Sequence, residues 1–353
     1  MSSVKASNSI LAKARAKYGR RLTPKNYRDM AALPSVSDVA AYLKNYTRFS
    51  EILANTKESS IHRDYLEKLI VDSNLENIAQ LCRFEKSAGE KLYEYIVQKV
   101  ETDEIINFVR YLAAGIPEQY LLDFSGRVDK MSKINFFKLA EVRSFKELMA
   151  FMAKTRYRKV FHSFPSTVGG VPDVTMIEAS LDNLVFKDTL KLIKSGGFSE
   201  GTKKELEELL GVQADLLNLR RLYRGKKYYN VSTDLLRARM IDTHRHFSKR
   251  TTEKLIAAAD EKEVLEIIKT TYYNRFLDKY DFEHIDFFAA CVMQELCGRR
   301  MKMSVSPAVV MFCYVIYTES ETENITNIIE GVRYEESPDK ISQVLIQIDK
   351  EGG

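Results

Sequence analysis

Apolar residues recur along most of this 353-residue chain at the spacing of amphipathic helices. The alternation of apolar and polar positions that marks a half-buried strand is almost nowhere sustained. Glycine and proline, which interrupt helices, number only 15 and 7. They concentrate at residues 161–174 and 195–202, with a weaker signal at 113–120, and these are the expected loops. The pattern predicts an all-α protein.

One helical pattern occurs three times, beginning at Ser35, Ser144 and Asp260. Each of these residues is a preferred helix N-cap, and an acidic residue follows three positions later, where it complements the positive end of the helix dipole. Apolar residues then form one buried stripe. Each copy ends on a threonine followed two residues later by an aromatic residue. These threonines are Thr47, Thr155 and Thr271.

A second helical pattern recurs with a similar period and places asparagines at equivalent positions. These are Asn107, Asn218 and Asn327. A third candidate helix lies between the two patterns, at residues 61–70, 177–186 and 282–292. Three elements in the same order, at a period of about 110 residues, indicate a triplicated chain. We therefore expect three helical modules, at residues 1–125, 126–232 and 233–353.

Composition narrows the function classes. The net charge is only +5, and the 29% of charged residues have mixed sign, as on a soluble globular surface. The longest apolar run, residues 307–317, is too short to span a bilayer and predicts a buried helix. The start of the chain lacks the pattern of a secretory signal, so we expect a cytosolic protein. The four cysteines lack metal-ligand spacing and are expected to be buried free thiols.

Catalytic motifs are weak. Gly196 and Gly201 have the spacing of a phosphate loop, but Thr202 precedes Lys203 and no strand comes before them, so an inter-helix loop is favoured. His244 and His246 are two residues apart, which turns their rings to different sides of a helix. No nucleophile or zinc-protease signature occurs. We expect no catalytic residue, no cofactor and no metal site.

Two segments admit other interpretations. "NLRRLYRGKKYYN", from Asn218, contains five basic residues and three tyrosines without an acid, which is compatible with a nucleic-acid patch. Lysine and arginine at a helix end also offset the negative end of its dipole. Residues 133–154 resemble a basic amphipathic membrane helix, although their second half is a copy of the repeated helix and favours core packing.

Several segments resemble one known family, the C subunit of the bacterial and archaeal V/A-type ATPases, which is related to the d subunit of the vacuolar enzyme. The segments are "AKARAKYGRRLTPKNYRDM" with "VAAYLKNYTRF" near the start, "IEASLDNLVF" in the middle, and "SPAVVMFCYVIYTESETENITNIIEGVRYEESPDKI" near the end. The similarity extends from about Leu11 to Leu345. Residues 116–132 and 161–174 align poorly with the family pattern.

The resemblance implies three similar helical modules arranged as a pseudo-threefold funnel. It implies a non-catalytic rotor subunit of the central stalk, which joins the shaft subunits to the membrane proteolipid ring on its cytoplasmic face. Neither nucleic acid nor a small-molecule substrate is expected as a partner. The alternative is a helical-repeat adaptor that binds nucleic acid or protein. The candidate partner contacts are basic residues that follow the repeated asparagines: Arg110, Arg220, Arg221, Arg224, Lys226, Lys227 and Arg333.

Overall fold

The computed structural model describes residues 3–57, 61–88, 91–165 and 170–346. These residues form α-helices and short 3₁₀-helices joined by turns, with no strand among them, so the all-α prediction is confirmed. Internal contacts divide the chain into two compact units, one of residues 1–90 with 278–353 and one of residues 91–277. The three-module boundaries and the funnel remain predictions.

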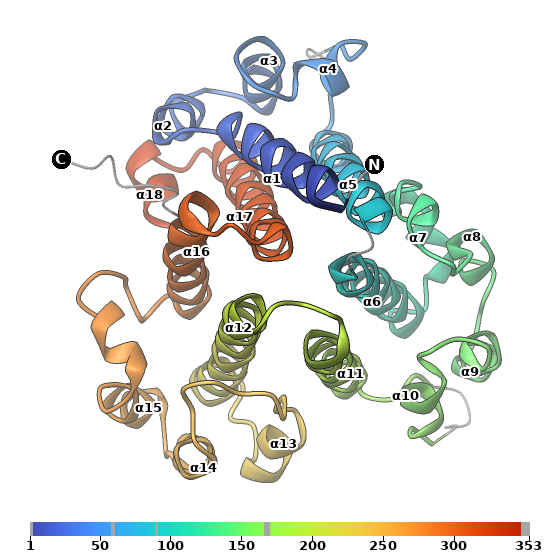
Figure 1. Cartoon of the computed structure of the whole chain (residues 1–353), viewed down its shortest axis with the longest axis vertical. Helices are drawn as coiled ribbons and strands as arrows, with labels where there is room; N and C mark the ends of the chain where they lie inside the picture. The colour runs from blue at the N-terminus through green and yellow to red at the C-terminus, as the bar shows by residue number, and fades with distance from the viewer. Residues whose placement is uncertain (1–2, 58–60, 89–90, 166–169, 347–353) are drawn as a thin grey trace. The chain divides into compact units, whose positions relative to one another are not determined.

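Four long helices form the centre of the first unit: α1 (Ser3–Gly19), α5 (Arg63–Ala88), α16 (Ile285–Met303) and α17 (Pro307–Arg333). Helix α1 lies beside α5 and α17, and α17 also packs on α16 (Figure 1). The apolar run at the start of α17 is buried on all sides, as expected. The short helices are α2 (Pro24–Ala31), α3 (Val36–Tyr46), α4 (Ser50–Leu53) and α18 (Pro338–Gln343).

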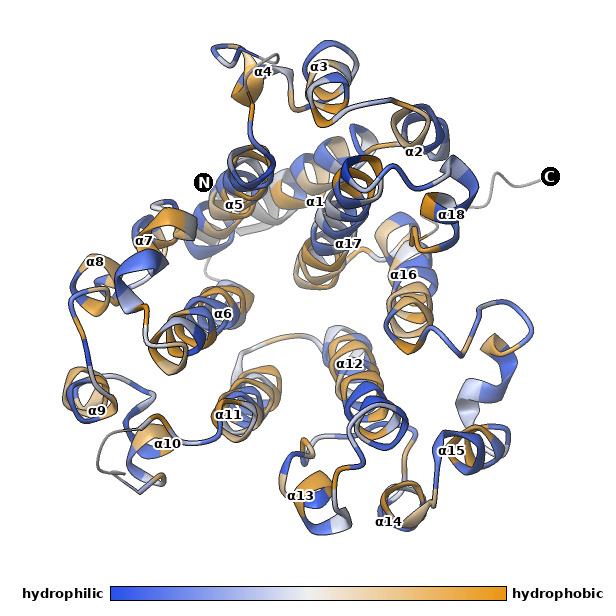
Figure 2. Ribbon diagram, turned by 180° about the vertical axis from the view of Figure 1, so that it is seen from behind, coloured by the Kyte–Doolittle hydropathy of each residue, from blue (hydrophilic) through white to orange (hydrophobic). Residues whose placement is uncertain are grey.

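The second unit is built on α6 (Leu92–Ala113), α11 (Val174–Ser195) and α12 (Glu200–Lys227). Helix α11 packs against both α6 and α12. The short helices from α7 to α10 carry apolar residues (orange in Figure 2). The short elements of this unit are η2 (Pro117–Gln119), α7 (Tyr120–Asp123), η3 (Val128–Lys130), α8 (Phe136–Leu139), α9 (Phe145–Met152), α10 (Arg158–His162), α13 (Thr233–Ala238), α14 (Lys249–Ala257), α15 (Glu261–Ile268) and η4 (Tyr272–Phe276).

The three predicted helix starts are confirmed. The side chains of Ser35, Ser144 and Asp260 accept hydrogen bonds from first-turn amides of α3, α9 and α15. The structural reason for the repeated threonines is also visible. Each threonine hydroxyl donates to a carbonyl of the preceding helix and accepts from the amide of the aromatic residue two positions later, at 3.2 Å. These aromatic residues are fully buried: Phe49, Tyr157 and Tyr273.

Several other expectations can be compared with the structure. The loop predicted at residues 195–202 is confirmed but shorter, because α11 ends at Ser195 and α12 begins at Glu200. Residues 166–169 of the loop expected at 161–174 lie outside the described residues. The segment 133–154 forms two helices, α8 and α9, whose residues Phe145, Leu148 and Met152 are buried, so core packing is confirmed there.

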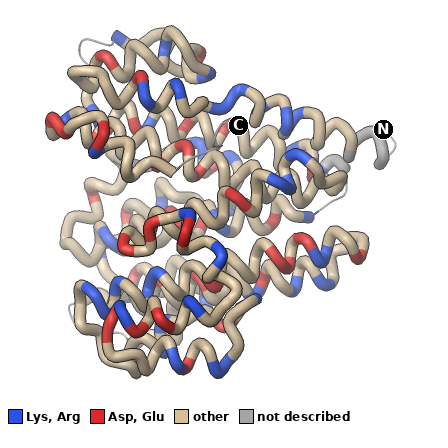
Figure 3. Tube along the Cα trace, turned by 90° about the vertical axis from the view of Figure 1, so that its left-hand side faces the viewer, with Lys and Arg blue, Asp and Glu red and all other residues tan. Residues whose placement is uncertain are grey.

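The cysteines are free and buried, as expected. None of the helices in the described part of the chain is long and apolar enough to cross a membrane. Basic and acidic residues are interspersed along the chain trace (Figure 3).

Candidate functional site

The asparagine of the basic stretch has a structural role. The buried side-chain amide of Asn218 in α12 accepts a hydrogen bond from the amide of Ile241 at 2.8 Å and donates to the carbonyl of the same residue at 2.9 Å. In α17, Asn324 makes the same two bonds with Ile346, at 2.7 and 2.8 Å. The two asparagines therefore clamp the chain segments that follow their helices.

The pair of asparagines that makes these bonds differs from the predicted set, which stays a prediction. The residue equivalent to Asn218 is Asn324, whereas Asn327 lies one turn further along α17 and is half-buried. Asn107 is also half-buried. The period of the sequence did not separate Asn324 from Asn327, because they follow Asn218 by 106 and 109 residues and both values are close to the expected period.

Two of the predicted contact residues make bonds within the fold. The Arg221 guanidinium forms an ion pair with Asp182 of α11 and donates to the carbonyl of Arg239 at 2.9 Å. The Lys226 ammonium donates to the carbonyl groups of Ile256 and Ala258 at the end of α14. Burial lowers the pKa of Lys226. These two cations hold α12 to its neighbours within the second unit.

The remaining basic residues of this stretch differ in their exposure. Arg220 and Lys227 are half-buried and Arg224 is exposed. The Lys227 ammonium lies 3.2 Å from the Tyr223 hydroxyl, a hydrogen bond that raises the pKa of Lys227, and 5.4 Å from the centre of the Tyr228 ring. Tyr228 and Tyr229 are both exposed. The end of α12 therefore presents a cationic and aromatic surface, formed by Arg224, Lys227, Tyr228 and Tyr229.

The other two candidates lie elsewhere. Arg110 is exposed at the end of α6 and pairs with Glu178 at 2.9 Å. Arg333 is exposed at the end of α17, with its guanidinium 5.4 Å from the centre of the Tyr334 ring. Arg110 therefore shares a unit with the α12 surface, and Arg333 belongs to the other unit.

Three buried acids that sequence reasoning did not single out hold the long helices to short ones. They are Glu101, Asp215 and Glu321. The Asp215 carboxylate accepts from the amides of Arg245, His246 and Phe247 and from the Tyr273 hydroxyl, all between 2.7 and 3.3 Å. Burial nevertheless raises the pKa of Asp215. The sequence contained a pattern that could have identified two of these acids, because Asp215 and Glu321 each precede a buried asparagine by three residues.

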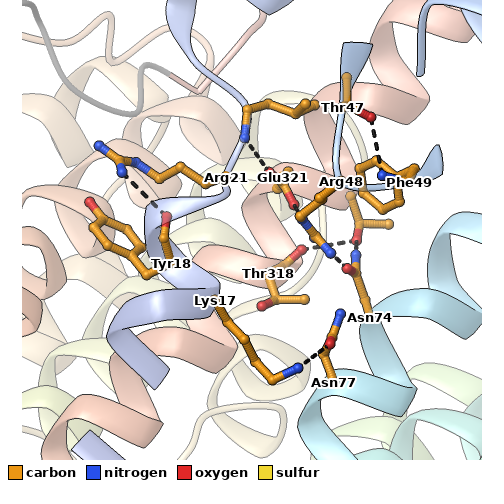
Figure 4. Close-up of polar contacts among 12 residues, drawn as sticks. Lys17, Tyr18, Arg21, Thr47, Arg48, Phe49, Asn74, Asn77, Thr318 and Glu321 are labelled. Carbon is orange, nitrogen blue, oxygen red and sulfur yellow. Dashed lines mark hydrogen bonds and ion pairs between the residues drawn. The ribbon is translucent and has the colours of Figure 1, made fainter. Parts of the chain in front are cut away.

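The Glu321 carboxylate lies in a polar cluster of the first unit, shown in Figure 4. It accepts from the amide of Leu22 at 2.7 Å and forms a buried ion pair with Arg48. The Arg48 guanidinium also donates to the amide oxygen of Asn74 in α5, at 2.6 Å. The cluster joins α17, α5 and the segment after α3. Because its charges are paired inside the fold, its role is structural.

The residues considered for metal and phosphate binding have other contacts in the structure. Within the described ranges, no group of three or more His, Cys, Asp or Glu side chains could hold a metal ion. His246 stacks on Tyr272 with the ring centres 3.6 Å apart and lies 3.0 Å from a Glu208 oxygen, whereas His244 contacts the Asp242 carbonyl. At the phosphate-loop candidate, Ser199 caps α12 and Lys203 pairs with Glu200 at 2.8 Å. These residues serve the helix start.

Comparison with known proteins gives the family. The family described as "ATP synthase (C/AC39) subunit" matches residues 10–344. A curated relative, the C subunit of the A-type ATP synthase of Methanosphaera stadtmanae, is 19% identical over 263 residues. That alignment covers 74% of this chain and 65% of the relative, so the chain spans less than two thirds of the relative's length. The match to the family is nearly as long as the chain, and the chain therefore belongs to the ATP synthase (C/AC39) subunit family.

Proposed function

We propose that this chain is a non-catalytic rotor subunit in the central stalk of a V/A-type rotary ATPase. It forms a socket between the central shaft and the membrane proteolipid ring on the cytoplasmic face. There it couples rotation to proton or sodium transport, or to ATP synthesis. The observation that carries the proposal is the family match over residues 10–344.

The internal contacts suit a part that transmits torque. A rotor element must not deform under load, and buried charge-assisted hydrogen bonds restrict the relative movement of packed elements. In the second unit, Asp215 and Glu101 tie α12 and α6 to buried tyrosines that follow short helices. In the first unit, Arg48 and Glu321 provide an equivalent connection. Each unit is therefore braced internally by buried polar contacts.

The partner contacts can now be narrowed. Because Arg224, Tyr228 and Tyr229 are exposed together and Lys227 lies beside Tyr228, we assign the binding role to these residues at the end of α12. A cationic surface of this kind favours an acidic partner surface by charge complementarity. We propose that Arg224 and Lys227, with Tyr228 and Tyr229, contact an acidic surface of the shaft or ring.

The test is co-purification of the tagged chain from native membranes, with mass spectrometry of the proteins retained. Shaft and proteolipid subunits are expected. The double variant Arg224→Ala/Lys227→Ala should retain its fold and recover less of the shaft or of the ring, whichever this surface contacts. The matched control is Lys203→Ala/Lys204→Ala, which removes two cations from the opposite end of the same helix. Equal recovery by the two variants would contradict the contact, and absence of all ATPase subunits would contradict the function.

The alternative function, a helical-repeat adaptor that binds nucleic acid or protein, is supported by the composition of the basic stretch but less by its structure. Two of the five cations in that stretch are used to hold α12 to its neighbours. Nucleic-acid binding that falls steeply as salt is raised would favour the alternative.

A further inference from the structure

The turn between α16 and α17 exposes two apolar side chains. Helix α16 ends at Met303 and α17 begins at Pro307. The side chains of Met303 and Val305 are 75% and 85% exposed, the highest values among the large apolar residues of the described ranges. Single exposed apolar residues are common on protein surfaces, but two at the tip of one turn form a local feature.

The turn is fixed in place by α1. The Arg15 guanidinium donates to the carbonyl groups of Met301, Lys302 and Ser304, at 3.0, 3.3 and 2.6 Å. Ser306 caps α17 by accepting from the amide of Val309 at 3.4 Å. These bonds hold the backbone on both sides of Val305 in the conformation in which the two side chains are exposed.

The charged residues next to the turn in the sequence have one sign. The last turns of α16 carry Arg299, Arg300 and Lys302, and no acidic residue occurs between Leu296 and Thr318. Arg299 and Lys302 are exposed. Cations beside exposed apolar residues are the composition of protein segments that enter the interface of an anionic bilayer, where apolar burial and phosphate attraction add.

We propose that the α16–α17 turn, residues 303–306, contacts an anionic lipid surface. Met303 and Val305 enter the interfacial region, and Arg299 and Lys302 lie among the headgroup phosphates. A stable protein interface needs about 800 Å² per partner, far more than two side chains on a turn provide. A lipid surface sets no such minimum, because each inserted side chain contributes separately. This lipid contact is additional to the proposed rotor function. It depends on that function only because the function places the chain at a membrane.

The absence of tryptophan from the sequence permits a direct test. Val305→Trp introduces the only tryptophan, and its emission reports whether the turn enters a bilayer. The purified full chain is mixed with vesicles of phosphatidylcholine alone, or of equal parts phosphatidylcholine and phosphatidylglycerol. Leu122→Trp is the control, because Leu122 of α7 is 73% exposed, similar to Met303.

We expect the emission of Val305→Trp to shift to the blue with the anionic vesicles only. Lipids brominated on the acyl chain should quench this emission, and high salt should abolish the shift. Met303→Ser/Val305→Ser should lower binding to these vesicles by about tenfold or more, with an unchanged unfolding midpoint. An unshifted Val305→Trp, or an equal shift of Leu122→Trp, would overturn the proposal. So would a photo-crosslinker at position 305 that labels a protein in native membranes instead of lipid. Failure here leaves co-purification with ATPase subunits unaffected, so the two proposals are tested separately.

Discussion

The Tyr273 hydroxyl donates a 2.8 Å hydrogen bond to Oδ2 of Asp215, and both side chains are fully buried. Tyr157 makes the same 2.8 Å bond with Glu101. At the corresponding place after α3 stands Phe49, which has no hydroxyl, and the neighbouring Arg48 reaches Glu321 instead. Each of the three repeated turns therefore places a hydrogen-bond donor next to a buried acid. The donor is a tyrosine hydroxyl in two of the turns and an arginine guanidinium in the third.

Loss of the Tyr273 hydroxyl should destabilise the protein. Tyr273→Phe removes one of four donors to a carboxylate that has no access to water, so we expect a loss of about 1–3 kcal/mol in the free energy of unfolding. Chemical denaturation followed by circular dichroism measures it. Tyr46→Phe, at an exposed position in α3, is the control and should change stability little. Equal stability of the two variants would show that the bond contributes nothing.

The two bonds of Asn324 to Ile346 predict that substitutions of Asn324 and Asn327 have unequal effects. Asn324→Ala should cost about 2–3 kcal/mol, because it breaks two buried hydrogen bonds and leaves the amide and carbonyl of Ile346 without their partner. Asn327→Ala, at a half-buried position on the same helix, should cost less than about 1 kcal/mol. Thermal unfolding of both variants is the measurement. A larger loss of stability for Asn327→Ala than for Asn324→Ala would support Asn327 as the equivalent of Asn218.

Two glycines of α12 should respond to alanine with opposite signs. A Cβ atom at Gly225 would lie 2.7 Å from the buried Leu236 side chain, so Gly225→Ala forces that side chain to move and should destabilise by about 1–3 kcal/mol. A Cβ atom at Gly201 meets nothing within 4 Å. Gly201→Ala should therefore stabilise by up to about 1 kcal/mol through higher helix propensity. The denaturation midpoints of the two variants measure these effects. If both variants were more stable than the parent protein, the close packing of Gly225 against Leu236 would be refuted.

Asp182 should give stability a distinctive pH dependence. Burial raises its pKa to about 6 from an ordinary value near 3.8, despite the adjacent Arg221. Between these values the native state binds more protons than the unfolded state, so the contribution of Asp182 decreases as pH rises from about 4 to 6, by up to about 3 kcal/mol. Unfolding across this range, compared with Asp182→Asn, measures the contribution. The variant should lack this decrease, and identical profiles would contradict the raised pKa.

The sequence by itself determined the helical class and the three recurring helix starts. Caps at Ser35, Ser144 and Asp260 bond to amides two or three residues away, and Thr47, Thr155 and Thr271 bond within four residues. Contacts of such short range follow from residue order alone, because the helix geometry brings these positions together wherever the segment packs.

Only the tertiary structure decided which polar residues are buried and what they hold. Glu321 meets Leu22 and Arg48 across most of the length of the chain, and Asn324 rather than Asn327 faces Ile346. The fold also decides which neighbouring segments Arg221 and Lys226 bond to and leaves Arg224 exposed. In the sequence, a basic residue has the same charge and the same place in the repeat whether the fold bonds it to a neighbouring segment or leaves it exposed. The distinction arises from long-range packing, which determines the polar groups that lose water and must find partners inside the fold.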